Sequence, residues 1–97
     1  MLAKQMKDKC NEVAEMLKVI AHPKRLMIMC HLGEGEKNVS ELLNLCDISQ
    51  SQLSQFLSRM QREKLIKLRK EGTFSYYSIA DKSILKLMQS MQKIFCS

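Results

Sequence analysis

Four cysteines and one polar, basic stretch are the parts of this 97-residue sequence whose residue types could do chemistry. A thiolate is at once a nucleophile, a metal ligand and a partner in a disulfide. The cysteines are Cys10, Cys30, Cys46 and Cys96, too sparse for a disulfide scaffold and without the paired CxxC of a zinc ribbon. Any disulfide in this chain is therefore expected to be conditional.

The basic stretch accounts for much of the net charge of +6. Residues 1–48 balance seven basic side chains against seven acidic ones, whereas residues 49–97 carry nine against three. Six of the nine crowd into residues 59–70 with one acid among them: Arg59, Arg62, Lys64, Lys67, Arg69 and Lys70. Such a run favours a polyanionic partner, although a charge run by itself is more often a solvated face.

The elements that position these residues can be predicted from periodicity and capping. Apolar residues at three-and-four spacing predict a first helix over about 4–20, and Pro23 suits the first turn of a second helix that Gly33 and Gly35 close. Capping patterns predict a short helix over about 39–46, a longer one from Ser49 to near Lys64, and a last helix after Asp81. Between the last two, alternation around Gly72 predicts a β-hairpin.

The sequence thus predicts a mainly α fold with a small β-hairpin, in the order α-α-α-α-β-β-α, as a single domain over residues 1–97. Two capped helices joined by three or four residues are typical of a helix-turn-helix, whose second helix reads DNA. Residues 49–58 carry no charge. The helix therefore presents hydroxyl and amide groups near its start and the guanidinium groups of Arg59 and Arg62 near its end. Gln can pair with adenine, Ser with either kind of edge, and Arg with guanine or phosphate.

The candidate DNA-binding residues come from the reader helix and the hairpin. On the helix they are Ser49, Gln50, Ser51, Gln52, Ser54, Gln55, Ser58, Arg59 and Arg62. On the hairpin, Arg69, Lys70 and Thr73 are expected to reach a flanking phosphate or the minor groove.

Three stretches resemble one known family, the ArsR/SmtB-type winged helix-turn-helix regulators. They are LKVIAHPKRLMIMCHL, VSELLNLCDISQSQLSQFLSRMQREKLI and LRKEGTFSYYSI, which together cover most of the chain. The resemblance implies a homodimeric DNA-binding repressor, with the first and last helices at the dimer interface and the fourth helix in the major groove. The apolar stripes at both ends of the chain agree with such an interface.

Metal-sensing members of that family carry Cys-Val-Cys-Asp at the start of the third helix, or Asp, His, His and Glu on the last helix. The first motif is replaced here by Asn38, Val39, Ser40 and Glu41, and the last helix keeps Asp81 but has no histidine. His22 and His31 are interpreted as cap or surface residues. We therefore predict no metal ligands and no cofactor, and a metal-responsive repressor remains the alternative.

Cys30 and Cys96 resemble the dithiol of the persulfide- and redox-responsive subgroup, the BigR, SqrR and HlyU type. The resemblance implies that reactive sulfur species or oxidants link the two within one protomer and that operator affinity then falls. HlyU-type members are also activators that relieve silencing, so the direction of regulation stays open. His31 and Lys93 are candidate positive charges near the thiols, while Cys46 and Cys10 are interpreted as inert packing.

The sequence gives little support for an enzyme or a membrane protein. No nucleophile, base and orienting group can be placed together, and no glycine-rich phosphate loop exists, so we expect no enzymatic activity. No run of about 18 apolar residues occurs. We therefore expect a soluble, cytoplasmic protein whose partners are double-stranded operator DNA, a second copy of itself and a reactive sulfur or oxidant inducer, and no membrane.

Overall fold

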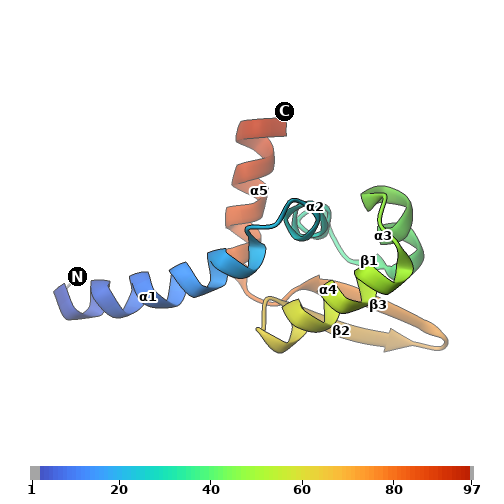
Figure 1. Cartoon of the computed structure of the whole chain (residues 1–97), viewed down its shortest axis with the longest axis horizontal. Helices are drawn as coiled ribbons and strands as arrows, with labels where there is room; N and C mark the ends of the chain where they lie inside the picture. The colour runs from blue at the N-terminus through green and yellow to red at the C-terminus, as the bar shows by residue number, and fades with distance from the viewer. Residues whose placement is uncertain (1–2, 97) are drawn as a thin grey trace.

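The computed structural model describes residues 3–96, which form five helices and three short strands. Figure 1 shows their arrangement. In chain order the elements are α1 (Ala3–Ile20), α2 (Pro23–Leu32), β1 (Lys37–Asn38), α3 (Val39–Cys46), α4 (Gln50–Arg62), β2 (Ile66–Glu71), β3 (Phe74–Ile79) and α5 (Lys82–Cys96).

The helices begin where the capping residues predicted them to begin. His22 precedes Pro23, and its Nδ1 accepts a hydrogen bond from the backbone N–H of Lys24 at 3.1 Å. Ser49 Oγ accepts from the N–H of Gln52 at 3.1 Å, and Asp81 Oδ1 accepts from the N–H of Ser83 at 2.6 Å. Each cap satisfies a backbone donor that the first turn of a helix leaves without a partner.

The third helix has the most complete cap. Asn38 Oδ1 accepts from the N–H of Glu41, and Glu41 Oε1 accepts from the N–H of Asn38, both at 2.9 Å. This reciprocal capping box fixes the start of α3 and therefore the first half of the helix-turn-helix.

Replacing Asn38 by Ala should lower the free energy of unfolding by about 0.5–2 kcal/mol, because α3 loses its N-terminal acceptor. Urea unfolding at one protein concentration measures this, with Asn44→Ala on the exposed side of α3 as the matched control. Equal stability of the two variants would show that the capping box contributes nothing.

One contiguous core joins all five helices to the hairpin. Its buried members are Val19, Ile20, Ile28, Met29, Leu32, Leu42, Cys46, Leu53, Leu57, Met60, Leu65, Ile66, Ile79 and Met88. The three from α4 recur at intervals of four and three residues, so one side of that helix is buried and the other is left to solvent.

The sheet has three strands where the sequence predicted two. The hairpin forms as expected, with Ile66 opposite Ile79 and Gly72 at a positive φ of 61° in the turn. The additional strand, β1, pairs with β3 through Lys37 and Asn38, giving the order β1-β3-β2. Two residues are too few to show a period of two, so the sequence pattern could not reveal this strand.

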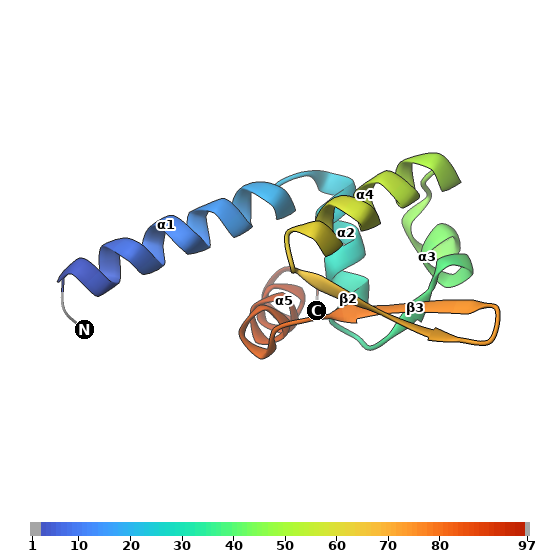
Figure 2. The same cartoon turned by 90° about the horizontal axis from the view of Figure 1, so that it is seen from below.

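The two terminal helices extend away from the body of the fold. Figure 2 shows α1 on one side of the body and the hairpin tip on the opposite side. Apolar side chains on both helices stay exposed, including Met6, Val13 and Leu17 on α1 and, at 70% and 78% exposed, Ile94 and Phe95 on α5. Within residues 3–96 no helix is both long enough and apolar enough to cross a bilayer.

Candidate nucleic-acid interface and thiol pair

A three-residue turn holds α3 and α4 together as a helix-turn-helix. Asp47, at its start, adopts a left-handed conformation with φ of 47°. Lys24 on α2 supports the turn because its Nζ donates to the carbonyl oxygens of Cys46 and Asp47 at 3.2 and 3.0 Å. The turn is therefore stabilised by hydrogen bonds from α2 as well as by the packing of α3 and α4 in the core.

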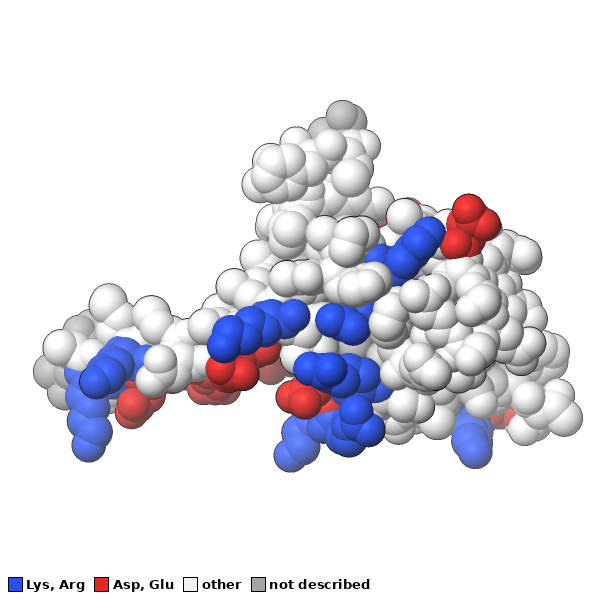
Figure 3. Space-filling view, viewed as in Figure 1, with Lys and Arg blue, Asp and Glu red and all other residues white. Residues whose placement is uncertain are grey.

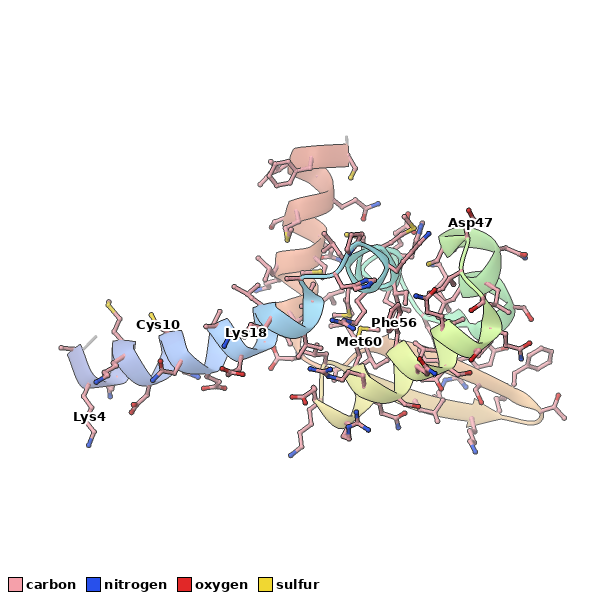
Figure 4. All side chains as sticks on the ribbon, in the orientation of Figure 1. Lys4, Cys10, Lys18, Asp47, Phe56 and Met60 are labelled. Carbon is pink, nitrogen blue, oxygen red and sulfur yellow. The ribbon has the colours of Figure 1, made fainter. Side chains whose placement is uncertain are left out.

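Phe56 anchors α4 against the junction of α1 and α2, an arrangement that the sequence did not predict. Its ring meets the ring of His22 edge-on at 4.9 Å, and the guanidinium of Arg25 lies 5.1 Å from its centre. Arg25 Nε also donates to the carbonyl oxygen of Val19 at the end of α1. Figure 4 shows Phe56 and Met60 on the side of α4 that faces α2.

The opposite side of α4 is exposed along its length. It carries the helical residues predicted from sequence: Gln50, Ser51, Gln52, Ser54, Gln55, Ser58, Arg59 and Arg62. Figure 3 shows basic side chains gathered over the C-terminal part of α4, whereas the surface over its start is mostly uncharged. The structure thus brings the predicted reader residues onto one surface, with the preceding Ser49 engaged as the cap.

The wing, which we define as residues 66–79, adds a second exposed surface. Lys70 and Thr73 are exposed near its tip, as the DNA-binding prediction requires. Phe74, which that prediction missed, is 54% exposed and lines a groove with residues from the starts of α3 and α4. Arg69 differs from the others because its guanidinium already contacts the carboxylates of Glu36 and Glu71.

Cys30 lies on α2 and Cys96 at the end of α5, two helices that pack against each other. Gln89 Nε2 donates to the carbonyl oxygen of Gly33 at 3.3 Å, and Gln92 Nε2 to Glu34 Oε2 at 3.4 Å. Cys96 lies on the same face of α5 as Gln92, one turn later. Cys30 lies on the last turn of α2, about one turn before Gly33 and Glu34, which follow that helix. The thiols are close enough for the charge of one to act on the other.

The two thiols differ in their exposure. Burial raises the pKa of Cys30 above its ordinary value, and the negative charges of Cys96 and Glu34 raise it further. His31, expected to bring positive charge to Cys30, instead contacts Glu34 through Nδ1 at 3.1 Å. Cys30 is therefore mainly a protonated, half-buried thiol at neutral pH, whereas Cys96 is exposed.

The other two cysteines have different surroundings from each other. Cys46 is fully buried, as predicted, and burial raises its pKa. Cys10 is exposed on α1, so the packing expected for it is not supplied within a single chain. Within the part of the chain that is described, no three His, Cys, Asp or Glu side chains come together as a metal site would require.

A helix-turn-helix with a polar reader face, followed by a hairpin and a last helix, defines a winged helix-turn-helix DNA-binding protein. Residues 22–72, just over half of the chain, match the family model described as bacterial regulatory protein, arsR family. The chain belongs to the ArsR family of transcriptional regulators.

Similar proteins come from several bacteria. The biofilm growth-associated repressor of Agrobacterium fabrum is 37% identical over 95% of this chain and 79% of its own. The solved structure of reduced HlyU from Vibrio cholerae is 29% identical with a TM-score of 0.90, covering 97% and 99% of the two chains. A homodimeric DNA-binding domain from Mycobacterium bovis is 26% identical, with a TM-score of 0.78 over 96% and 86%.

Proposed function

We propose that this regulator is a homodimeric repressor that binds a pseudo-palindromic operator and releases it when Cys30 and Cys96 become linked. The observation that carries DNA binding is the exposed face of α4, uncharged at its start and basic at its end. A helix whose start enters the major groove and whose end lies along phosphates needs this order of side chains. The two half-sites should be about one helical turn apart, on the order of 10 base pairs.

The proposal divides the interface residues into two sets. Gln50, Ser51, Ser54 and Gln55 set the base preference, while Arg59, Arg62 and Lys70 mainly set affinity through phosphates. Ser49, Gln52, Ser58 and Thr73 complete the surface as hydrogen-bonding groups.

Replacing Arg59 or Arg62 by Ala should weaken operator and random DNA about equally and flatten the slope of log K against log salt by about 0.9 for each phosphate that the variant no longer neutralises. Fluorescence anisotropy at several salt concentrations measures this, with Lys86→Ala on α5 as the control for removing one charge elsewhere. Gln55→Ala should instead change the preferred base and leave the slope in place. A change of base preference in the Arg variants would contradict the division.

The proposed sensor uses the difference in exposure between the two thiols. The exposed Cys96 thiolate attacks the outer sulfur of a persulfide RSSH, forms Cys96–S–SH and releases RS⁻. Cys30, once deprotonated, attacks the Sγ atom of Cys96 in this persulfide. The Cys30–Cys96 disulfide forms, and the outer sulfur leaves as HS⁻. Inserted sulfur atoms would lengthen the bridge where the Cα atoms are farther apart than the roughly 7 Å that a disulfide spans.

One experiment tests the proposal as a whole. Mobility shift on the DNA upstream of its own gene compares reduced protein with persulfide-treated and zinc-treated protein, and intact mass is measured on the same samples. We expect release only with persulfide, together with the loss of two hydrogens or the gain of whole sulfur atoms. Release by zinc and not by persulfide would overturn the sensor in favour of a metal-responsive repressor.

A further inference from the structure

Arg69 of the wing makes polar contacts with three other side chains. Its Nε donates to Glu36 Oε2 at 3.0 Å and its Nη2 to Glu36 Oε1 at 2.7 Å, a side-on bidentate pair. Its Nη1 donates to Glu71, and its Cζ lies 4.7 Å from the centre of the Tyr76 ring. Three of its five N–H donors are therefore committed within the protein.

This interaction crosses the whole sheet. Arg69 pairs with Tyr76 across β2 and β3, and Tyr76 pairs on its other side with Asn38 of β1. Glu36 immediately precedes β1, in the segment that leaves α2. By extending over Tyr76 to Glu36, Arg69 ties the outer strand of the wing to the segment between α2 and β1.

The wing has little else to hold its outer half. From Arg69 to Phe74 every residue is exposed, and none of them belongs to the buried core. β1 pairs with β3 and leaves the outer edge of β2 without a strand. A charged bidentate pair is suited to setting the angle of such a hairpin because its geometry is specific.

The local charge also argues against a phosphate partner for Arg69. One guanidinium and two carboxylates give these three side chains a net charge of −1, so the positive charge of Arg69 is already neutralised within the protein. A phosphate could bind Arg69 only by displacing Glu36, whose pKa the hydrogen bond from Arg69 holds below its ordinary value.

We propose that Arg69 is a positioning residue of the DNA interface, holding the wing in place through Glu36 without contacting the operator itself. This inference rests on the proposed DNA-binding function. It replaces the direct phosphate contact that the basic run in the sequence suggested for Arg69.

Glu36→Gln distinguishes the two roles by the direction of its effect on affinity, and Arg69→Ala distinguishes them by the salt slope. If Arg69 positions the wing, each variant weakens operator binding by a similar factor, roughly 3- to 10-fold, the double variant is no weaker than the singles, and the salt slope stays unchanged. Arg69→Lys should resemble Arg69→Ala, because an ammonium cannot form the bidentate pair. Both single variants should also speed hydrogen exchange in residues 66–79 of the DNA-free protein.

A phosphate contact would give the reverse pattern. Glu36→Gln would then strengthen binding by freeing the guanidinium, Arg69→Ala would flatten the salt slope by about 0.9 per phosphate, and Arg69→Lys would keep most of the affinity. That pattern, or unchanged affinity and exchange in both single variants, overturns the proposal. Arg59→Ala separates failure of the proposed DNA-binding function from failure of the role of Arg69. If Arg59→Ala leaves DNA binding intact, the proposed DNA interface is wrong. If Arg59→Ala weakens binding but the Glu36 and Arg69 variants do not, only the role of Arg69 is wrong.

Discussion

Persulfide treatment of the reduced protein should lower its operator affinity 5- to 150-fold, the range that a coupling free energy of about 1–3 kcal/mol produces. A bridge from Cys96 to Cys30 ties the end of α5 to α2, where Gln89 and Gln92 already contact the residues that follow the last turn of α2. Because α5 also carries part of the proposed dimer interface, a shift there changes the separation of the two reader helices. The two reader helices can then no longer bind both half-sites at once, because the half-sites are a fixed helical turn apart.

Single cysteine variants test this mechanism directly. Cys30→Ser and Cys96→Ser should each bind the operator like the reduced wild type and keep that affinity in persulfide, as measured by anisotropy with intact mass. Cys46→Ser and Cys10→Ser are the matched controls and should respond like wild type. Continued induction of both the Cys30 and the Cys96 variant would rule out the dithiol.

The pH dependence follows from the pKa of Cys30. Because that pKa is raised, the thiolate needed to close the bridge is scarce at neutral pH and grows about tenfold per pH unit until pH reaches the pKa. Bridge formation should accelerate about tenfold per pH unit, or about 100-fold between pH 6 and 8, and should keep rising above the pH at which an ordinary thiol is fully ionised. The modification of Cys96 in Cys30→Ser, followed over the same range of pH, measures the first step alone. Equal pH profiles for the two reactions would place the slow step at Cys96.

A glutamate at Val13 should separate the dimer and reduce operator affinity by about 10²–10⁴-fold, the advantage that linking two binding units can confer. Val13 lies on an exposed apolar stripe of α1 with Met6, Cys10 and Leu17, a surface that a second copy would cover. A buried carboxylate without a partner would make that association unfavourable.

Sedimentation and anisotropy measure the two parts of this result. Asn11→Glu adds the same charge on the other side of α1 and should remain dimeric with near wild-type affinity. Val13→Glu should still bind a single half-site weakly, because α4 is unchanged. A wild-type monomer at micromolar concentration that binds the full operator tightly would refute the dimer model.

Local features of the sequence were sufficient to predict the helices and the reader face. Asn38, Ser49 and Asp81 cap helices because a side-chain oxygen can satisfy N–H groups only two or three residues away. The buried stripe Leu53, Leu57 and Met60 follows from the period of a helix, and the exposed polar residues of α4 are its complement. These interactions depend on near neighbours in the chain and are therefore visible in the order of residues.

Contacts between distant residues were decided only by the tertiary structure. Arg69 belongs to a basic run in the sequence, yet its guanidinium is bound by Glu36, 33 residues away, because β1 brings that segment beside β3. The pKa of Cys30 is raised by burial, by Cys96 on α5 and by Glu34 just after α2, whereas the sequence suggested a positive charge from His31. Such effects depend on which surfaces pack together, and a side chain's partner across a sheet or between helices leaves no periodic trace in the chain.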